Sequence, residues 1–192
     1  MNEKTITVVS GLPRSGTSMM MMMLEAGGMQ VLTDHVREAD TDNPRGYYEY
    51  EPVKNLESDN TWLPLAQGKA VKIISALLIY LSDSYRYKLI FMRRNMEEIL
   101  SSQRKMLVRR GKGSEGTSDE RMKKVLERHL SEVEEWLSLK SNMDVLYADY
   151  NQVIAEPKDQ ARRIFNFMDR QVDLRMMARA VDERLYRERI DI

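Results

Sequence analysis

Five short apolar runs punctuate the chain, and longer segments with helical signals lie between them. The longer runs are continuous rather than alternating, which is typical of parallel strands covered on both faces. Strand and helix therefore alternate, and the pattern predicts an α/β fold: a three-layer, P-loop-like arrangement with a central parallel sheet of about five strands flanked by helices. The expected strands cover residues 5–9, 30–32, 70–74, 88–92 and 143–147.

Local signals predict where the helices begin and end. The first is expected to stop at Gly27-Gly28, and the third opens with a capping box of Thr117 and Glu120. The fourth starts at Pro157, and the last runs from 173 to 187. The third helix is expected to pack one stripe on the core, formed by Met122, Leu126, Leu130, Val133 and Leu137. The expected starts are positions 16, 95, 117, 157 and 173.

Length and composition limit the possible classes of function. The 192 residues predict one domain over 1–192. Thirty basic and thirty acidic residues cancel, so any anion site has to be local, and we expect neither nucleic acid nor a membrane as partner. The absence of cysteine and the presence of only two histidines argue against a metal centre. The N-terminus lacks the pattern of a secretory signal, so we expect a cytoplasmic location.

The segment GLPRSGTS, from Gly11 to Ser18, joins the first strand to the first helix. At such a junction, backbone N–H groups and the positive end of the helix dipole point at one place. The glycines allow close approach of an anion, and Arg14 adds a forked cation suited to phosphate or sulfate. A nucleotide hydrolase would carry lysine where Thr17 stands. The loop is therefore predicted to bind an anion without the usual lysine and magnesium.

Pro13 to Ser18, written PRSGTS, resembles the 5′-phosphosulfate loop of the sulfotransferases that use 3′-phosphoadenylyl sulfate (PAPS). Its arginine version resembles tyrosylprotein sulfotransferases and many bacterial members. The family's second signature is a strand running into Arg-Asn-Pro, with a serine eight residues after the arginine. Here KLIFMRRNMEEILSSQ provides Arg94 and Ser102, although methionine replaces the proline. The resemblance implies that this pair holds the 3′-phosphate, with Arg93 as an alternative ligand.

Two further segments extend the resemblance to roughly residues 4–170. GKAVKII is similar to a strand ending in Lys-Thr-His, which implies that Lys72 contacts the transferring sulfonate. VLYADYNQ is similar to the segment that places a tyrosine, here Tyr150, beside the adenine. The family's histidine is absent, since Ile74 or Ser75 stands there. Its C-terminal Arg-Lys-Gly loop is not recognisable either, and four residues could replace it at the 3′-phosphate: Arg109, Arg110, Arg184 and Arg187.

The general base is left open by the sequence. In tyrosylprotein sulfotransferases a glutamate follows the first helix and second strand, and the same distance leads here to Asp34 and His35. His35 has the intrinsic pKa for accepting a proton near neutrality. Glu49 and Glu51 are rivals, because the tyrosines beside them could line an acceptor pocket. His129, on a helix, is expected to be structural, and the run Met19–Met23 is expected to pack in the core.

These observations predict an enzyme, a sulfotransferase that moves a sulfonate from PAPS to a hydroxyl or amine acceptor by in-line transfer. The resemblance implies 3′-phosphoadenosine 5′-phosphate (PAP) as product and requires no metal. Arg14 would stabilise the bridging oxygen as the leaving phosphate departs, and the loop Pro13, Arg14, Ser15, Gly16, Thr17, Ser18 would hold the 5′-phosphate. We expect the acceptor to be a small molecule or a peptide with a hydroxyl group. The sequence is compatible with a homodimer.

Two alternatives remain at this point. One is a P-loop kinase that uses ATP and magnesium to phosphorylate a small molecule. The other is a non-catalytic relative that binds the nucleotide without chemistry, and the missing histidine favours it.

Overall fold

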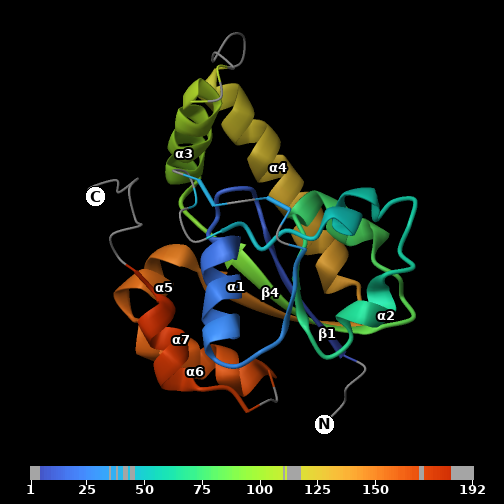
Figure 1. Cartoon of the computed structure of the whole chain (residues 1–192). Helices are drawn as coiled ribbons and strands as arrows, with labels where there is room; N and C mark the ends of the chain where they lie inside the picture. The colour runs from blue at the N-terminus through green and yellow to red at the C-terminus, as the bar shows by residue number, and fades with distance from the viewer. Residues whose placement is uncertain are drawn as a thin grey trace.

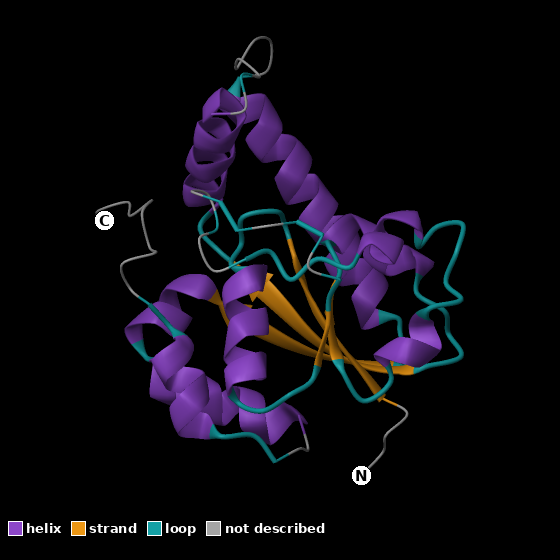
Figure 2. Ribbon diagram, viewed as in Figure 1, coloured by secondary structure: helices purple, strands orange, loops and turns teal. Residues whose placement is uncertain are grey.

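The computed structural model places five parallel strands at the centre of the molecule, with helices on both faces (Figures 1 and 2). The order across the sheet is β2-β3-β1-β4-β5, and every pairing is parallel. This confirms the predicted three-layer α/β fold. The strands are β1 Thr5–Gly11, β2 Val31–Leu32, β3 Ala70–Lys72, β4 Arg86–Arg93 and β5 Met143–Asp149. The structure describes residues 5–34, 36–37, 39–40, 43, 46–109, 111, 118–168 and 171–182.

Two layers of helices cover the sheet (Figure 1). One core lies between the sheet and α1, α5, α6 and α7. The second lies between the sheet and α2, the 3₁₀ helices η1 and η2, and the C-terminal half of α4. The bounds are α1 Thr17–Ala26, η1 Glu51–Asn55, α2 Leu63–Ala66, η2 Ser75–Tyr80, α3 Met96–Arg109, α4 Asp119–Ser138, α5 Tyr150–Ala155, α6 Pro157–Met168 and α7 Leu174–Ala180.

The helix boundaries differ from the prediction in three places. Ser118, not Thr117, caps α4, because its hydroxyl accepts the backbone N–H of Arg121 at 3.3 Å; Thr117 lies outside the described residues. The last helix ends at Ala180, since Val181 is extended. Four short elements, α2, α5, η1 and η2, were not predicted, because four to six residues are too few to show a helical period.

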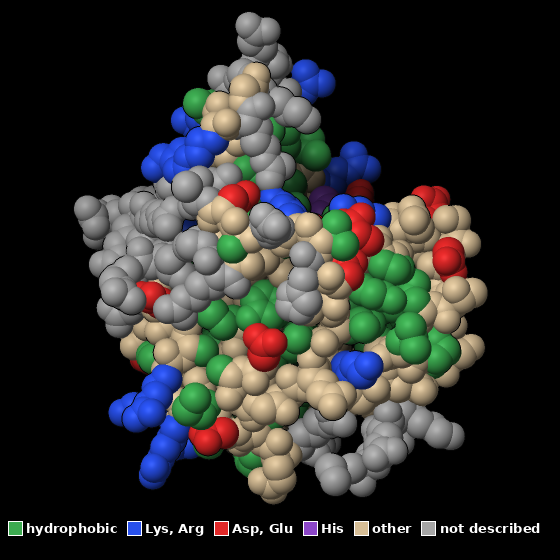
Figure 3. Space-filling view, viewed as in Figure 1, with side chains coloured by type: hydrophobic (Ala, Val, Ile, Leu, Met, Phe, Trp, Pro, Cys, Tyr) green, Lys and Arg blue, Asp and Glu red, His purple; other side chains and the backbone are tan. Residues whose placement is uncertain are grey.

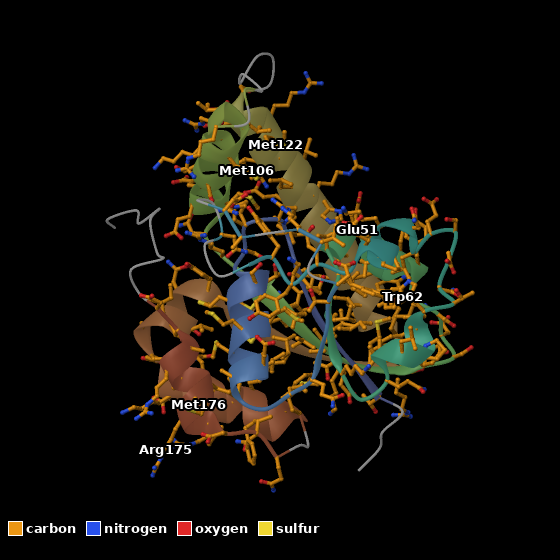
Figure 4. The ribbon with its side chains drawn as sticks, viewed as in Figure 1. Glu51, Trp62, Met106, Met122, Arg175 and Met176 are labelled. Atoms are coloured by element: carbon orange, nitrogen blue, oxygen red, sulfur yellow. The ribbon has the colours of Figure 1, made fainter. Side chains whose placement is uncertain are left out.

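The predicted apolar stripe of α4 packs on the core only in its C-terminal half. Val133 and Leu137 are buried against the sheet, but Met122 and Leu126 are only partly buried. The N-terminal half of α4 instead packs beside α3, and together they stand out from the body as a helical hairpin, called the arm below (Figure 1). Met106 of α3 and Met122 of α4 mark the arm in Figure 4. A stripe of period 3.6 predicts a buried face, but not which element covers it.

The methionine run of α1 is mostly core, as predicted. Met20, Met21 and Met23 are fully buried together with Leu24. Met19 and Met22 are half-buried and face a pocket at the edge of the sheet. In the part of the chain that the structure describes, no helix is both long and apolar enough to cross a membrane.

Candidate active site

The carboxyl ends of four neighbouring strands carry the residues singled out by the sequence. The loop Gly11–Ser18 follows β1, β3 ends at Lys72, Arg94 follows β4, and Tyr150 follows β5. Because β1 has β3 on one side and β4 on the other, the chain leaves β1 where the strand order reverses. Ligands of open α/β sheets bind at such a switch point, outside the carboxyl ends of the strands.

Two glycines let the loop after β1 lie close to its neighbours. Gly11 has φ 143°, and a Cβ there would lie 2.6 Å from the carbonyl oxygen of Met92 on β4. Gly16 has φ 98°, and a Cβ there would lie 2.3 Å from the ring of Tyr150. Neither position tolerates a side chain, so the loop can approach both β4 and the tyrosine only with glycine at these sites.

Arg14 connects the loop to the second motif. Its φ of 78° is in the left-handed region, which costs about 1–3 kcal/mol in a residue other than glycine. The backbone carbonyl of Arg14 accepts a hydrogen bond from Arg94 Nη1 at 3.1 Å. The side chain of Arg14 donates from Nε to Ser102 Oγ at 2.9 Å. The fold thus joins residues that are 80 and 88 positions apart in the sequence.

Arg94 is held by a buried carboxylate that the sequence reasoning missed. Glu98 accepts from Arg94 Nε at 2.8 Å, and the two side chains are 2% and 7% exposed. The second carboxylate oxygen of Glu98 accepts from Asn151 Nδ2 at 3.1 Å. The Arg94 guanidinium also lies 4.2 Å from the ring centre of Tyr150, whose pKa burial raises. The spacing of four between Arg94 and Glu98 was the available signal.

Arg93, the alternative ligand, has other partners. Its guanidinium pairs with Glu134 of α4 at 2.7 Å and lies over the ring of Tyr147. Arg93 is not among the described residues that line the pocket. Of the two arginines, the structure therefore brings Arg94 to the loop and Arg93 to α4.

Lys72 lies at the opposite side of the loop, almost fully buried. Its ammonium lies 3.8 Å from Glu49 Oε1 and 3.5 Å from Ser18 Oγ, and it donates to the carbonyl of Tyr47. Burial lowers the pKa of Lys72 to about 8, although the nearby Glu49 carboxylate acts in the opposite direction. Lys72 is therefore mostly charged at neutral pH and loses its proton under mildly alkaline conditions.

The four candidate bases, Asp34, His35, Glu49 and Glu51, differ in their positions and partners. Glu49 lines the pocket and pairs with Arg37 at 2.7 Å. Asp34 does not line it; burial alone would raise its pKa, but hydrogen bonds from the backbone N–H groups of Glu51 and Val36 lower it overall. Glu51 (labelled in Figure 4) pairs with Lys54 and is also not a described lining residue. His35 lies outside the described residues.

His129 contacts η2 rather than the pocket. Its Nε2 lies 2.9 Å from the hydroxyl of the buried Ser75, which follows the Lys72 strand. This bond ties α4 to η2. His129 is not among the described lining residues, in keeping with the structural role expected for it.

The loop after β1 and the side chains of Lys72, Glu49, Arg94, Ser102 and Tyr150 line one pocket of about 650 Å³. One end is formed by the loop after β1, Arg94, Ser102 and Tyr150, and the other by Lys72, Glu49 and the tyrosines near them. Lys and Arg side chains gather on the arm and at its base, above this edge of the sheet (Figure 3). No group of three histidine or acidic residues that could hold a metal occurs in the described ranges.

The hydrogen-bond donors of the loop suit an oxyanion. Ser15 is almost fully buried, and its hydroxyl has no hydrogen-bond partner among the described residues. The glycines on either side lack the Cβ that would collide with Ser15, Met92 or Tyr150, so the loop can keep this compact shape. An oxyanion in the loop could accept from the Ser15 hydroxyl and from the first N–H groups of α1, and Arg14 would supply the charge.

A sequence profile of the sulfotransferase domain matches residues 4–188, nearly the whole chain. The chain belongs to the sulfotransferase domain family. Membership makes it an enzyme, a PAPS-dependent sulfotransferase that forms PAP and acts on a hydroxyl acceptor. This assignment is adopted in place of the two alternatives left by the sequence, an ATP-dependent kinase and a non-catalytic relative. None of the curated proteins matches the chain significantly.

Solved structures share the fold at low sequence identity. A sulfotransferase domain from the curacin biosynthetic pathway is 12% identical, covers 97% of this chain and 87% of its own, and has a TM-score of 0.53. The sulfotransferase domain of the Synechococcus PCC 7002 olefin synthase is 14% identical (96% and 76% covered, TM-score 0.50). Retinol dehydratase in complex with androsterone and the inactive cofactor PAP is 13% identical (95% and 64% covered, TM-score 0.50).

Glu98→Ala is expected to lower the free energy of unfolding by about 3–5 kcal/mol, because it leaves the buried Arg94 charge uncompensated. Urea unfolding followed by circular dichroism measures this. Glu97→Ala is the matched control, since the exposed Glu97 pairs only loosely with Lys123, at 3.4 Å, and its loss should cost less than about 1 kcal/mol. Equal stability of the two variants would contradict the assigned role of Glu98.

Proposed function

We propose that PAPS binds across this edge of the sheet, with its 5′-phosphosulfate on the loop Pro13–Ser18 and its 3′-phosphate at Arg94 and Ser102. The observation that carries the proposal is the double contact of Arg14, through its carbonyl to Arg94 and through its side chain to Ser102. The two motifs thus form one continuous site, lined also by Tyr150, which we place beside the adenine. By carrying arginine where the family usually has lysine, the loop resembles that of tyrosylprotein sulfotransferases and many bacterial members.

Transfer in this site needs a cation at each end of the breaking bond. The acceptor oxygen attacks the sulfur, and the bond between sulfur and the bridging oxygen breaks with its electron pair going to the 5′-phosphate of PAP. We assign Arg14 to the charge that develops on that oxygen and Lys72 to the sulfonate oxygens. Positioning and electrostatic stabilisation supply the catalysis, as in phosphoryl transfer, and no metal takes part in this scheme.

We assign to Glu49 the role of the general base that removes the proton of the acceptor hydroxyl. It is the carboxylate that both lines the pocket and lies within 3.8 Å of Lys72. Asp34 is less suited, because its two oxygens accept backbone N–H groups at 2.5 and 3.1 Å. A base has to reach the acceptor hydroxyl in the pocket, and position decides here before intrinsic pKa.

The acceptor end of the pocket favours a hydroxyl on an apolar body. Beside Glu49 it is lined by Met19, Met22, Tyr50, Val53 and Leu77. Methionine side chains adapt to irregular shapes, and tyrosine offers an aromatic face. A small molecule fits this description, and so does the side chain of a peptide. We further propose that residues 1–192 form one domain that acts in the cytoplasm.

The proposed function is tested by transfer of radiolabelled sulfonate from PAPS to a panel of phenols and aliphatic alcohols. We expect Arg14→Ala to lower turnover by about 10²–10³-fold, because it removes a donor aimed at the developing charge. PAP affinity should fall less. Arg175→Ala is the control: Arg175 is exposed on α7, at the opposite end of the molecule from the arm (Figure 4). Absence of transfer by the unchanged protein, or equal losses of turnover and affinity in Arg14→Ala, would contradict the proposal.

The role of Lys72 predicts a pH dependence of PAPS binding. Only the protonated ammonium attracts the sulfonate, and burial lowers its pKa to about 8. The affinity for PAPS should therefore fall as pH rises above about 8, by up to about tenfold per pH unit. PAP lacks the sulfonate and should not show this fall, and Lys72→Arg should abolish it, because arginine stays charged. Calorimetric titrations between about pH 6.5 and about pH 9.5 measure this pH dependence. A parallel decline for PAP and PAPS would rule out the assignment.

A further inference from the structure

The residues proposed to hold the 3′-phosphate supply little net charge. The Arg94 cation is paired at 2.8 Å with the buried Glu98 carboxylate, and Ser102 is neutral. A phosphate monoester carries about −1.5 to −2 charges near neutral pH. Bringing such a group out of water next to a compensated ion pair is unfavourable unless further cations contact it. This end of the pocket therefore requires basic residues beyond Arg94.

Helix α3 carries such residues on the face that contains Ser102. Lys105, Met106 and Arg109 follow Ser102 by three, four and seven positions, so they share one side of the helix. All four line the pocket. Along the helix axis Lys105 lies about 4.5 Å and Arg109 about 10 Å beyond Ser102, which is within reach of their long side chains. Both side chains are exposed, as expected for cations at the rim of a cleft.

The other cations of the described pocket lining serve its acceptor end or the loop. Arg37 pairs with Glu49 at 2.7 Å, and Lys54 pairs with Glu51 at 2.5 Å. Lys72 lies 3.8 Å from Glu49, and Arg14 belongs to the loop. By position, the basic residues that line the described pocket beside Ser102 on α3 are Lys105 and Arg109; Arg110, Arg184 and Arg187 lie outside the described residues. Two carboxylates, Glu49 and Asp182, also line the pocket, and Asp182 adds to the need for positive charge.

We infer that Lys105 and Arg109 complete the 3′-phosphate site from helix α3, in the role of the family's basic C-terminal loop, which is not recognisable in the sequence. The inference rests on the proposed function. Their two charges offset the phosphate that Arg94, already paired with Glu98, cannot offset alone. The arm is thereby part of the nucleotide site, and it selects adenosine nucleotides that carry a 3′-phosphate over those that do not.

The test compares two nucleotides, PAP and adenosine 5′-phosphate, which differ only in the 3′-phosphate. Calorimetric titrations use the full chain and the variants Lys105→Ala and Arg109→Ala. Each variant should weaken PAP binding by about tenfold, the magnitude typical of one charged hydrogen bond. Adenosine 5′-phosphate should bind with nearly unchanged affinity. Lys105→Arg and Arg109→Lys, which keep the charge, should recover most of the PAP affinity.

Arg104→Ala is the matched control, with the same loss of charge on the same helix. Arg104 is not a described lining residue and instead pairs with Asp119 of α4, so both nucleotides should bind as in the unchanged protein. Unchanged PAP affinity after loss of both Lys105 and Arg109 would overturn the inference, as would equal weakening of the two nucleotides. If the unchanged protein does not bind PAP, the proposed function fails, and this inference fails with it.

Discussion

The parallel pairing of β1 with β4 determines where the charged groups of the site lie. Seven residue pairs run from Thr5 opposite Arg86 to Gly11 opposite Met92, so the two strands end side by side. The loop after β1 and Arg94 after β4 then start from neighbouring points, and the Arg94 guanidinium reaches the carbonyl of Arg14. A side chain at Gly11 would collide with β4 at this point. The site thus depends on a backbone register that only glycine permits.

Around that junction, buried charges are placed next to groups that compensate them. Arg94 lies against Glu98 and over Tyr150, and Lys72 lies beside Glu49. Such pairs cost desolvation free energy, and they persist where function needs a fixed charge at a fixed place. In the proposed anion site, the guanidinium of Arg94 is thus already oriented before a ligand binds, which lowers the entropy lost on binding.

How much the sequence could predict depends on how local each signal is. The loop GLPRSGTS and the pair Arg94 and Ser102 were recognised because their spacing is fixed within one strand-helix junction each. The strands were found because continuous apolar runs mark buried parallel strands. Glu98 was missed because an acidic residue four positions after an arginine usually lies on a solvated helix face. Here Glu98 is buried and accepts a hydrogen bond from Asn151 of α5.

The base and the arm were less predictable for a related reason. Asp34 and Glu49 lie between β2 and η1, and Glu51 begins η1. This stretch has no period that relates position in the chain to direction in space. Only the folded structure shows that Asp34 bonds the backbone N–H of Glu51 while Glu49 faces Lys72. The stripe on α4 likewise predicted burial without naming the partner, and half of it packs beside α3 rather than on the sheet.

The central claim is that one nucleotide is held at both of its phosphates by two motifs that meet at Arg14. Phosphorus NMR of PAP during titration with the protein tests it most directly, since the 5′- and 3′-phosphates give separate resonances. The account predicts that both resonances shift together and reach their end points at one nucleotide per chain. A shift confined to one phosphate, or no shift of either, would contradict it.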